Sequence, residues 1–198
     1  MTMPAPTPRT EVADDPFDRL TREHRVVESL LRVIDALADR AAGGGIVERR
    51  ALGTVVEFLT EYGELGHHER EEGILTPVLI ANGFDWFEGP LATVRREHRQ
   101  EHYFYRVLGQ LALQPDAWSS EDVRRFVSVA RELTRFLRAH MQREEEQLFS
   151  VARQRLSAET KAALLAAFDR FDRSSHAETI LAALEERRHR LLEEYSIH

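Results

Sequence analysis

The chain has 198 residues, a formal net charge of −7 at pH 7 and no cysteine. This length suffices for one domain with a sizeable core, with or without an extension. The acidic balance, with Arg interleaved among Glu, argues against nucleic acid or an anionic membrane as the main partner. The lack of cysteine excludes disulfides, thiolate metal sites and cysteine nucleophiles, so any metal must be held by His, Asp or Glu.

The start of the chain, MTMPAPTPRTEVADDP, contains no hydrophobic signal segment, and its Pro content predicts a disordered arm over residues 1–15. No apolar run anywhere approaches the ~20 residues that a membrane helix needs. A cytoplasmic location is therefore the default expectation.

Helical periodicity dominates the rest of the chain and little of it resembles a strand, so we expect an all-α fold. Three glycines at positions 43–45 mark the first break, and Pro77 is expected to stop the second helix. The pattern predicts helices over about residues 16–40, 47–75, 90–113, 120–156 and 157–195.

The first four helices carry an internal repeat. REHR occurs at 22–25 and again at 96–99, while HHEREEGIL at 67–75 and HMQREEEQL at 140–148 share a His, three residues and Glu-Glu. His24 and His98 are 74 positions apart, and His67 and His140 are 73 apart. Each half therefore reads as a helical hairpin. Two such hairpins predict an up-down-up-down four-helix bundle over residues 16–156, followed by a C-terminal helical extension over 157–198.

The polar residues of the repeat fall in gaps of the apolar stripes, because helix residues three or four apart share a face. In the second helix the stripe resumes at Ile74 and Val78, and in the fourth it resumes at Leu148 and Val151. Seven polar side chains are predicted to point inward: His24, His67, Glu71, His98, His102, His140 and Glu144. Burying several unpaired charges is too costly for one domain, so two metal ions at one level of the bundle are expected to neutralise them.

Each of these residues also has an ordinary interpretation. A lone His on an apolar stripe is usually a core residue, and an HxxxE pair can be a simple hydrogen-bonded pair on a helix. The matched register of five His across four helices favours the metal centre. His68, by contrast, falls on a line of Glu residues and is predicted to lie on a solvated face. Glu23 and Glu97 read either as partners of the ligands or as surface charge.

Over about residues 16–156 the pattern resembles the hemerythrin family, specifically the hemerythrin-like HHE cation-binding domains. The resemblance rests on REH at 22–24, HHEREEGILTP at 67–77, REHRQEH at 96–102 and HMQREEEQLF at 140–149. It implies a four-helix bundle holding a non-haem di-iron centre, with two iron ions bridged by two carboxylates and an oxo or hydroxo group. Glu71 and Glu144 match the bridging carboxylates. The residues that match the His ligands are His24, His67, His98 and His140, with His102 matching a further His of the oxygen carriers.

One position departs from the oxygen carriers, which place an Asp five residues after the His of the fourth helix. Here Glu144 lies four residues after His140 and Glu145 lies five after it. Glu144 is the preferred ligand because it mirrors Glu71, and Glu145 is the alternative. Manganese or zinc would fit the same ligand types.

The resemblance implies a protein that binds O2 or NO for sensing, storage or stress response. The alternative is a di-iron enzyme that acts on peroxide or NO, or uses O2 to oxidise a substrate, and it would need a wider access route. A ferritin-type site is disfavoured, because it needs ExxH on two helices and the repeat offers only Glu64–His67. The apolar residues of the C-terminal extension predict that it either packs on the bundle or pairs subunits in a homodimer.

Overall fold

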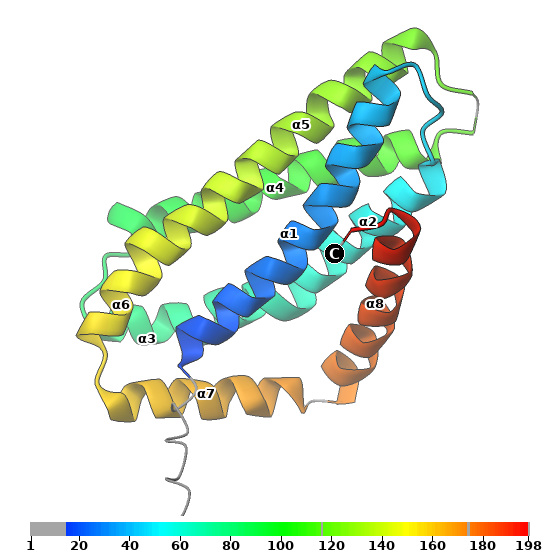
Figure 1. Cartoon of the computed structure of the whole chain (residues 1–198). Helices are drawn as coiled ribbons and strands as arrows, with labels where there is room; N and C mark the ends of the chain where they lie inside the picture. The colour runs from blue at the N-terminus through cyan, green and yellow to red at the C-terminus, as the bar shows by residue number, and fades with distance from the viewer. Residues whose placement is uncertain (1–14, 116, 174, 198) are drawn as a thin grey trace, which may run out of the picture.

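The computed structural model describes residues 15–115, 117–173 and 175–197, and every regular element in this part of the chain is helical (Figure 1). Apart from Asp15, the expected N-terminal arm lies outside the described residues. The α-helices are α1 (Pro16–Ala42), α2 (Arg49–Tyr62), α3 (Thr76–Ala81), α4 (Gly89–Leu113), α5 (Ser120–Arg143), α6 (Ser150–Arg155), α7 (Ala158–Asp172) and α8 (Ser175–Glu194). Three π-helical segments join them: η1 (Gly63–His67), η2 (Glu69–Leu75) and η3 (Glu144–Phe149).

The long helices pack side by side as a bundle, with α1 against α5, α2 against α4, and α4 against α5 (Figure 1). Their facing sides bury one large apolar cluster that includes Leu31, Leu52, Leu108 and Leu133. A second apolar cluster lies at the other end and contains Phe17, Leu79, Phe149 and Phe168 among others. The layer of polar side chains described below lies between these two apolar clusters. Apolar packing above and below it fixes the helices that carry the polar side chains.

The helix ends follow from local sequence. Asp15 caps α1 by accepting a hydrogen bond from the Phe17 amide, and Pro16 occupies the first turn, where its missing N–H is not needed. Ser119 and Asp122 form a reciprocal capping box at the start of α5. Gly44 adopts φ of +82°, which the turn after α1 requires and which glycine adopts without strain.

The π-helical segments change the register of both second helices of the repeat. A π-helix bonds each residue to the fifth along, so one turn holds an extra residue and the inward face moves on by about one position. After η2 the fully buried residues are therefore Leu75 and Leu79, while the predicted Ile74 and Val78 are partly buried and pack against the same apolar cluster. The helical path also continues to Ala81 instead of stopping at Pro77, because that proline lies in the first turn of α3.

The same shift follows η3. Leu148 is buried as predicted, but Val151 is exposed and Phe149 and Ala152 are buried instead. Each half of the repeat thus carries a π-helical segment directly at its HxxxEE phrase.

The C-terminal helices lie against the bundle (Figure 1). Leu164 and Phe168 of α7 are buried in the apolar cluster of Phe17, and Leu184 and Leu191 of α8 are buried in the larger cluster. The extension therefore packs on the chain's own bundle. Within the described ranges, no helix combines the length and apolar character needed to cross a membrane.

Candidate metal centre

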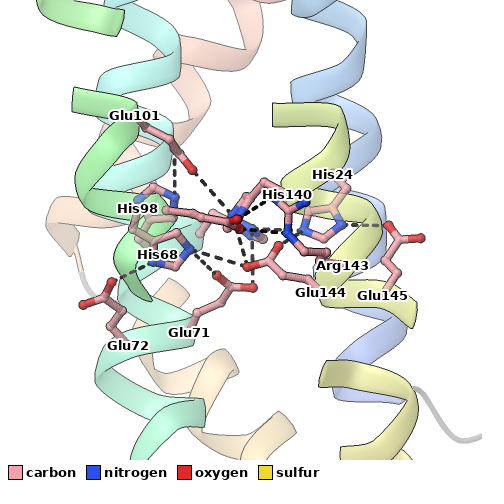
Figure 2. Close-up of polar contacts among 12 residues, drawn as sticks. His24, His68, Glu71, Glu72, His98, Glu101, His140, Arg143, Glu144 and Glu145 are labelled. Carbon is pink, nitrogen blue, oxygen red and sulfur yellow. Dashed lines mark hydrogen bonds and ion pairs between the residues drawn. The ribbon is translucent and has the colours of Figure 1, made fainter. Parts of the chain in front are cut away.

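Four buried imidazoles meet at one level of the bundle, each from a different helix. His24 comes from α1, His67 from η1, His98 from α4 and His140 from α5. Two buried carboxylates lie at the same level: Glu71 from η2 and Glu144 from η3 (Figure 2). The six residues belong to corresponding positions of the internal repeat, so each hairpin supplies two His and one Glu.

The Nε2 atoms face one another and the two carboxylates. His24 Nε2 lies 3.2 Å from His67 Nε2 and 3.0 Å from Glu144 Oε2. Glu71 reaches both halves, with Oε1 3.6 Å from His67 Nε2 and Oε2 3.3 Å from His98 Nε2. Glu144 likewise has Oε1 3.2 Å from His140 Nε2. Both carboxylates thus lie between imidazoles of different hairpins, where each could bridge two metal ions.

The Nδ1 atoms face outward, and a carboxylate from a neighbouring helix binds each of them. Nδ1 of His67 lies 2.8 Å from Glu23, and Nδ1 of His140 lies 2.9 Å from Glu97. Nδ1 of His98 lies 2.6 Å from Glu72, and Nδ1 of His24 lies 2.7 Å from Glu145 (Figure 2). A carboxylate at Nδ1 holds the proton there and leaves Nε2 with a free lone pair, which is the usual arrangement of a metal-binding His.

The inner charges perturb one another strongly. Burial acts to lower the pKa of His24, but Glu144, Glu71 and Glu145 outweigh it and raise the pKa to about 9. Burial opposes protonation of His140 as well, and Glu144, Glu97 and Glu101 raise its pKa to about 10. Burial acts to raise the pKa of Glu144, whereas His140, His24 and His98 hold it well below its usual range. The buried carboxylates therefore favour positive charge in the site. Without a metal cation, protons on His24 and His140 supply that charge.

The donor atoms that face inward also lack hydrogen bonds. Among the described residues, the buried side-chain atoms without a hydrogen-bond partner include both oxygens of Glu71 and of Glu144, and Nε2 of His98 and of His140. A buried polar atom left unpaired costs about 1–3 kcal/mol. Six such atoms converging on one space fit a site that metal cations fill, and imidazole and carboxylate are the ligand types that iron, manganese and zinc accept.

The structure shows which of the two candidate carboxylates, Glu144 or Glu145, faces the inner imidazoles. Glu144 is fully buried and faces the imidazoles, while Glu145 is partly exposed and binds Nδ1 of His24 from outside. Glu23 and Glu97, left open by the sequence, are partners of the inner His side chains.

Two predicted orientations are wrong. His102 does not point inward: its side chain is 50% exposed and pairs with Glu64 at 3.2 Å. His68 does not lie on a solvated face: its ring stacks on His98 with centroids 4.0 Å apart, and burial holds its pKa well below the usual range. The π-helical segments on either side of His68 turn it inward, which a uniform α-helical period could not predict.

Sequence reasoning missed Glu101, which is 2% exposed and lies at the level of the inner imidazoles (Figure 2). The buried positions of α4 advance by alternating steps of three and four: Leu91, Val94, His98, Glu101, Tyr105 and Leu108. Glu101 continues this progression and His102 does not. Strict application of the heptad spacing to the apolar residues would have found it.

A surface groove of about 360 Å³ lies beside His24, between α1 and the end of α5. Its lining includes Arg25, Arg138, Met141 and Glu145. The groove thus borders the outer side of His24, where Glu145 binds Nδ1.

The fold and site together define a helical-bundle protein whose clustered His and Glu side chains could hold metal cations. Comparison with protein families matches residues 15–152 to the hemerythrin HHE cation-binding domain, and the chain belongs to this family. No curated protein matches significantly, and neither does any solved structure. The family match spans α1 to α6 and leaves α7 and α8 outside it.

Proposed function

We propose that this chain holds a pair of iron ions and binds a small diatomic ligand, O2 or NO, for sensing, storage or a stress response. The proposed ligands are His24, His67, Glu71, His98, His140 and Glu144. The observation that carries the proposal is the convergence of unpaired Nε2 and carboxylate atoms, each inner His being held from outside by a second carboxylate. Iron, when bound, would supply reversible exchange of electrons with the small ligand.

The chain's own residues would fix the iron ions and restrict access to them. Glu71 and Glu144 would span the two ions, since each carboxylate lies between imidazoles of both hairpins. The apolar clusters on either side would exclude bulk water. The proposal includes an up-down-up-down course of α1, α2, α4 and α5 in a bundle over residues 16–156. The packing of α1 on α5, of α2 on α4 and of α4 on α5 supports this course.

A second candidate is an enzyme that reduces peroxide or NO, or uses O2 to oxidise a substrate. The groove beside His24 favours this alternative, because it is larger than a diatomic ligand needs. A homodimer through the C-terminal helices stays a prediction, since the described apolar side chains of α8 are used within the chain.

Metal analysis with visible spectroscopy tests the proposal. The purified chain should carry about two irons, and the spectrum of the reduced protein should change reversibly on exposure to O2 or NO. Rapid irreversible oxidation, with turnover of added peroxide, would favour the enzyme. Glu144→Ala should lose metal while Glu146→Ala, an exposed neighbour, keeps it. A chain that takes up no transition metal would refute the proposal.

A further inference from the structure

Glu101 is a buried carboxylate without an adequate partner. Its Oε2 accepts a hydrogen bond from the Tyr105 hydroxyl at 3.1 Å, and its Oε1 has no hydrogen-bond partner. The four carboxylates that hold the inner His residues all contact Nδ1 atoms. Glu101 instead faces Nε2 atoms, with Oε1 3.4 Å from Nε2 of His140 and Oε2 3.5 Å from Nε2 of His68. It therefore lies on the inner side of the imidazoles, where ligand atoms belong.

His68 approaches the same space from the neighbouring π-helical turn. Its ring stacks on His98 and its Nε2 faces Glu101. Gly63 borders this ring, and a Cβ at Gly63 would lie 3.4 Å from Cε1 of His68, an ordinary van der Waals contact. One ligand atom from each of His68, His98 and Glu101 lies within 4.8 Å of the other two, a separation that one metal ion can span.

The internal repeat shows that this pair exists in only one half of the centre. The repeat intervals of 74 and 73 residues place Val27 at the position of Glu101 and Met141 at the position of His68. The side of the centre near His24 and His67 thus corresponds to apolar residues, Val27 from the first hairpin and Met141 from the second. The side near His98 and His140 instead has Glu101 from the second hairpin and His68 from the first. Two polar side chains in a buried place where the repeat has apolar ones need a reason beyond packing.

We propose that Glu101 and His68 are additional ligands of the metal ion held by His98 and His140, so that the two ions of the centre have unequal ligand sets. This inference rests on the proposed function. One ion would have His24 and His67, and the other would have His98, His140, His68 and Glu101, with Glu71 and Glu144 shared. The added carboxylate contributes negative charge, which stabilises the trivalent over the divalent ion and lowers the reduction potential in this half.

Replacement of Glu101 by the isosteric amide tests the proposal. Glu101→Gln keeps the shape of the side chain. Glu64→Gln is the matched control, because the side chain of Glu64 is half exposed and pairs with the exposed His102. The readouts are metal ions per chain, affinity by competition with a chelator, and the Mössbauer spectrum of the iron-57 protein. His68→Gln is an independent second variant.

We expect two inequivalent irons in the wild-type chain and in Glu64→Gln. Glu101→Gln and His68→Gln should bind one of the two ions at least about tenfold more weakly, with a change confined to one iron signal. Wild-type affinity and an unchanged spectrum in both variants would overturn this inference alone. A wild-type chain that binds no pair of metal ions would overturn the proposed function instead.

A separate observation links the C-terminal extension to the other half of the centre. Glu23, which holds Nδ1 of His67, also lies 3.3 Å from the buried guanidinium of Arg70. The Nε of Arg70 donates to Oδ1 of Asp172 at the end of α7, at 3.1 Å, and Arg19 forms a further ion pair with Asp172. A continuous chain of charged contacts thus runs from α7 to an inner imidazole.

We infer that Asp172 is a positioning residue for His67. By sharing the charge of Arg70, it leaves Glu23 free to bind Nδ1 of His67. Asp172→Asn should weaken metal binding about tenfold and shift the visible spectrum, and Asp172→Glu should restore both. Asp169→Asn is the control, because Asp169 contacts Arg19 at 2.9 Å without being part of the Arg70 contacts. A lower melting temperature with an unchanged spectrum in Asp172→Asn would overturn the inference.

Discussion

The four carboxylates that hold Nδ1 atoms differ in burial, and this difference predicts a graded effect on metal binding. The side chains of Glu23 and Glu97 are 10% and 14% exposed, whereas those of Glu145 and Glu72 are 40% and 47% exposed. Each substitution Glu→Gln removes one negative charge beside the Nδ1 of a His, and it keeps an oxygen that can accept a hydrogen bond from Nδ1–H.

The expected magnitude follows from what can replace the lost charge. Loss of an outer partner of a metal ligand typically weakens metal binding 10–100-fold, or about 1.4–2.7 kcal/mol. Glu23 also contacts the buried Arg70, and Glu97 binds Arg143, so the loss of either takes one carboxylate partner away from a neighbouring cation. Water can reach Nδ1 in place of Glu72 or Glu145. We therefore expect losses near the upper end for Glu23→Gln and Glu97→Gln, and less than about tenfold for the other two.

Competition with a chelator of known affinity, at fixed pH and ionic strength, measures the four affinities. Circular dichroism of each variant controls for folding. The reasoning would be refuted by equal losses in all four variants, or by larger losses in the two exposed positions, because burial would then have no part in how the carboxylates act.

Three further outcomes are expected. His102→Ala should keep the wild-type metal content, while Glu144→Ala should lose most of it; metal analysis decides, and equal loss would contradict the orientation of α4. After chelation, the pKa values of about 9 for His24 and about 10 for His140 exceed the unfolded value near 6.5. Both side chains then carry protons at pH 7, and the stability they give the chelated protein is lost as pH rises through 9 to 10. Metal added to the chelated protein at pH 7 in weak buffer should therefore release protons, and metal added above pH 10 should release fewer. Equal proton release at the two pH values would contradict the protonation of His24 and His140. Phe168→Ala should lower the free energy of unfolding by about 3–5 kcal/mol in a denaturant titration, since the ring is fully buried; a change below about 1 kcal/mol would show that α7 is not part of the core.

The sequence was sufficient for the helical class, the repeat and the inner set of His24, His67, His98 and His140 at one level. These features depend only on periodicity and on matched spacing between two halves of the chain. The orientation of Glu71 and Glu144 followed from the same period because each lies four residues, about one turn, after its His.

The errors occur where the helix is not a uniform α-helix or where two positions share nearly one face. The π-helical turns bring His68 inward and shift the buried stripe to Leu75 and Leu79. Nothing in the residue types near His68 signals such a turn. Glu101 and His102 lie three and four residues after His98, so both fit the helical spacing from that residue. Only the longer progression of buried positions from Leu91 to Leu108 separates them.

The contacts at the Nδ1 atoms form a closed ring around the bundle. Within each hairpin, the first helix holds the His of the second, through Glu23 and Glu97; between hairpins, Glu72 and Glu145 hold the His of the other first helix. The internal repeat maps each contact of this ring onto another contact of the ring. Two identical copies of a single hairpin, associated around a two-fold axis, would close the same ring with every imidazole held. The single chain thus has the contact pattern of a symmetric pair of hairpins, and because both hairpins lie in one chain, a substitution in one of them leaves the other unchanged.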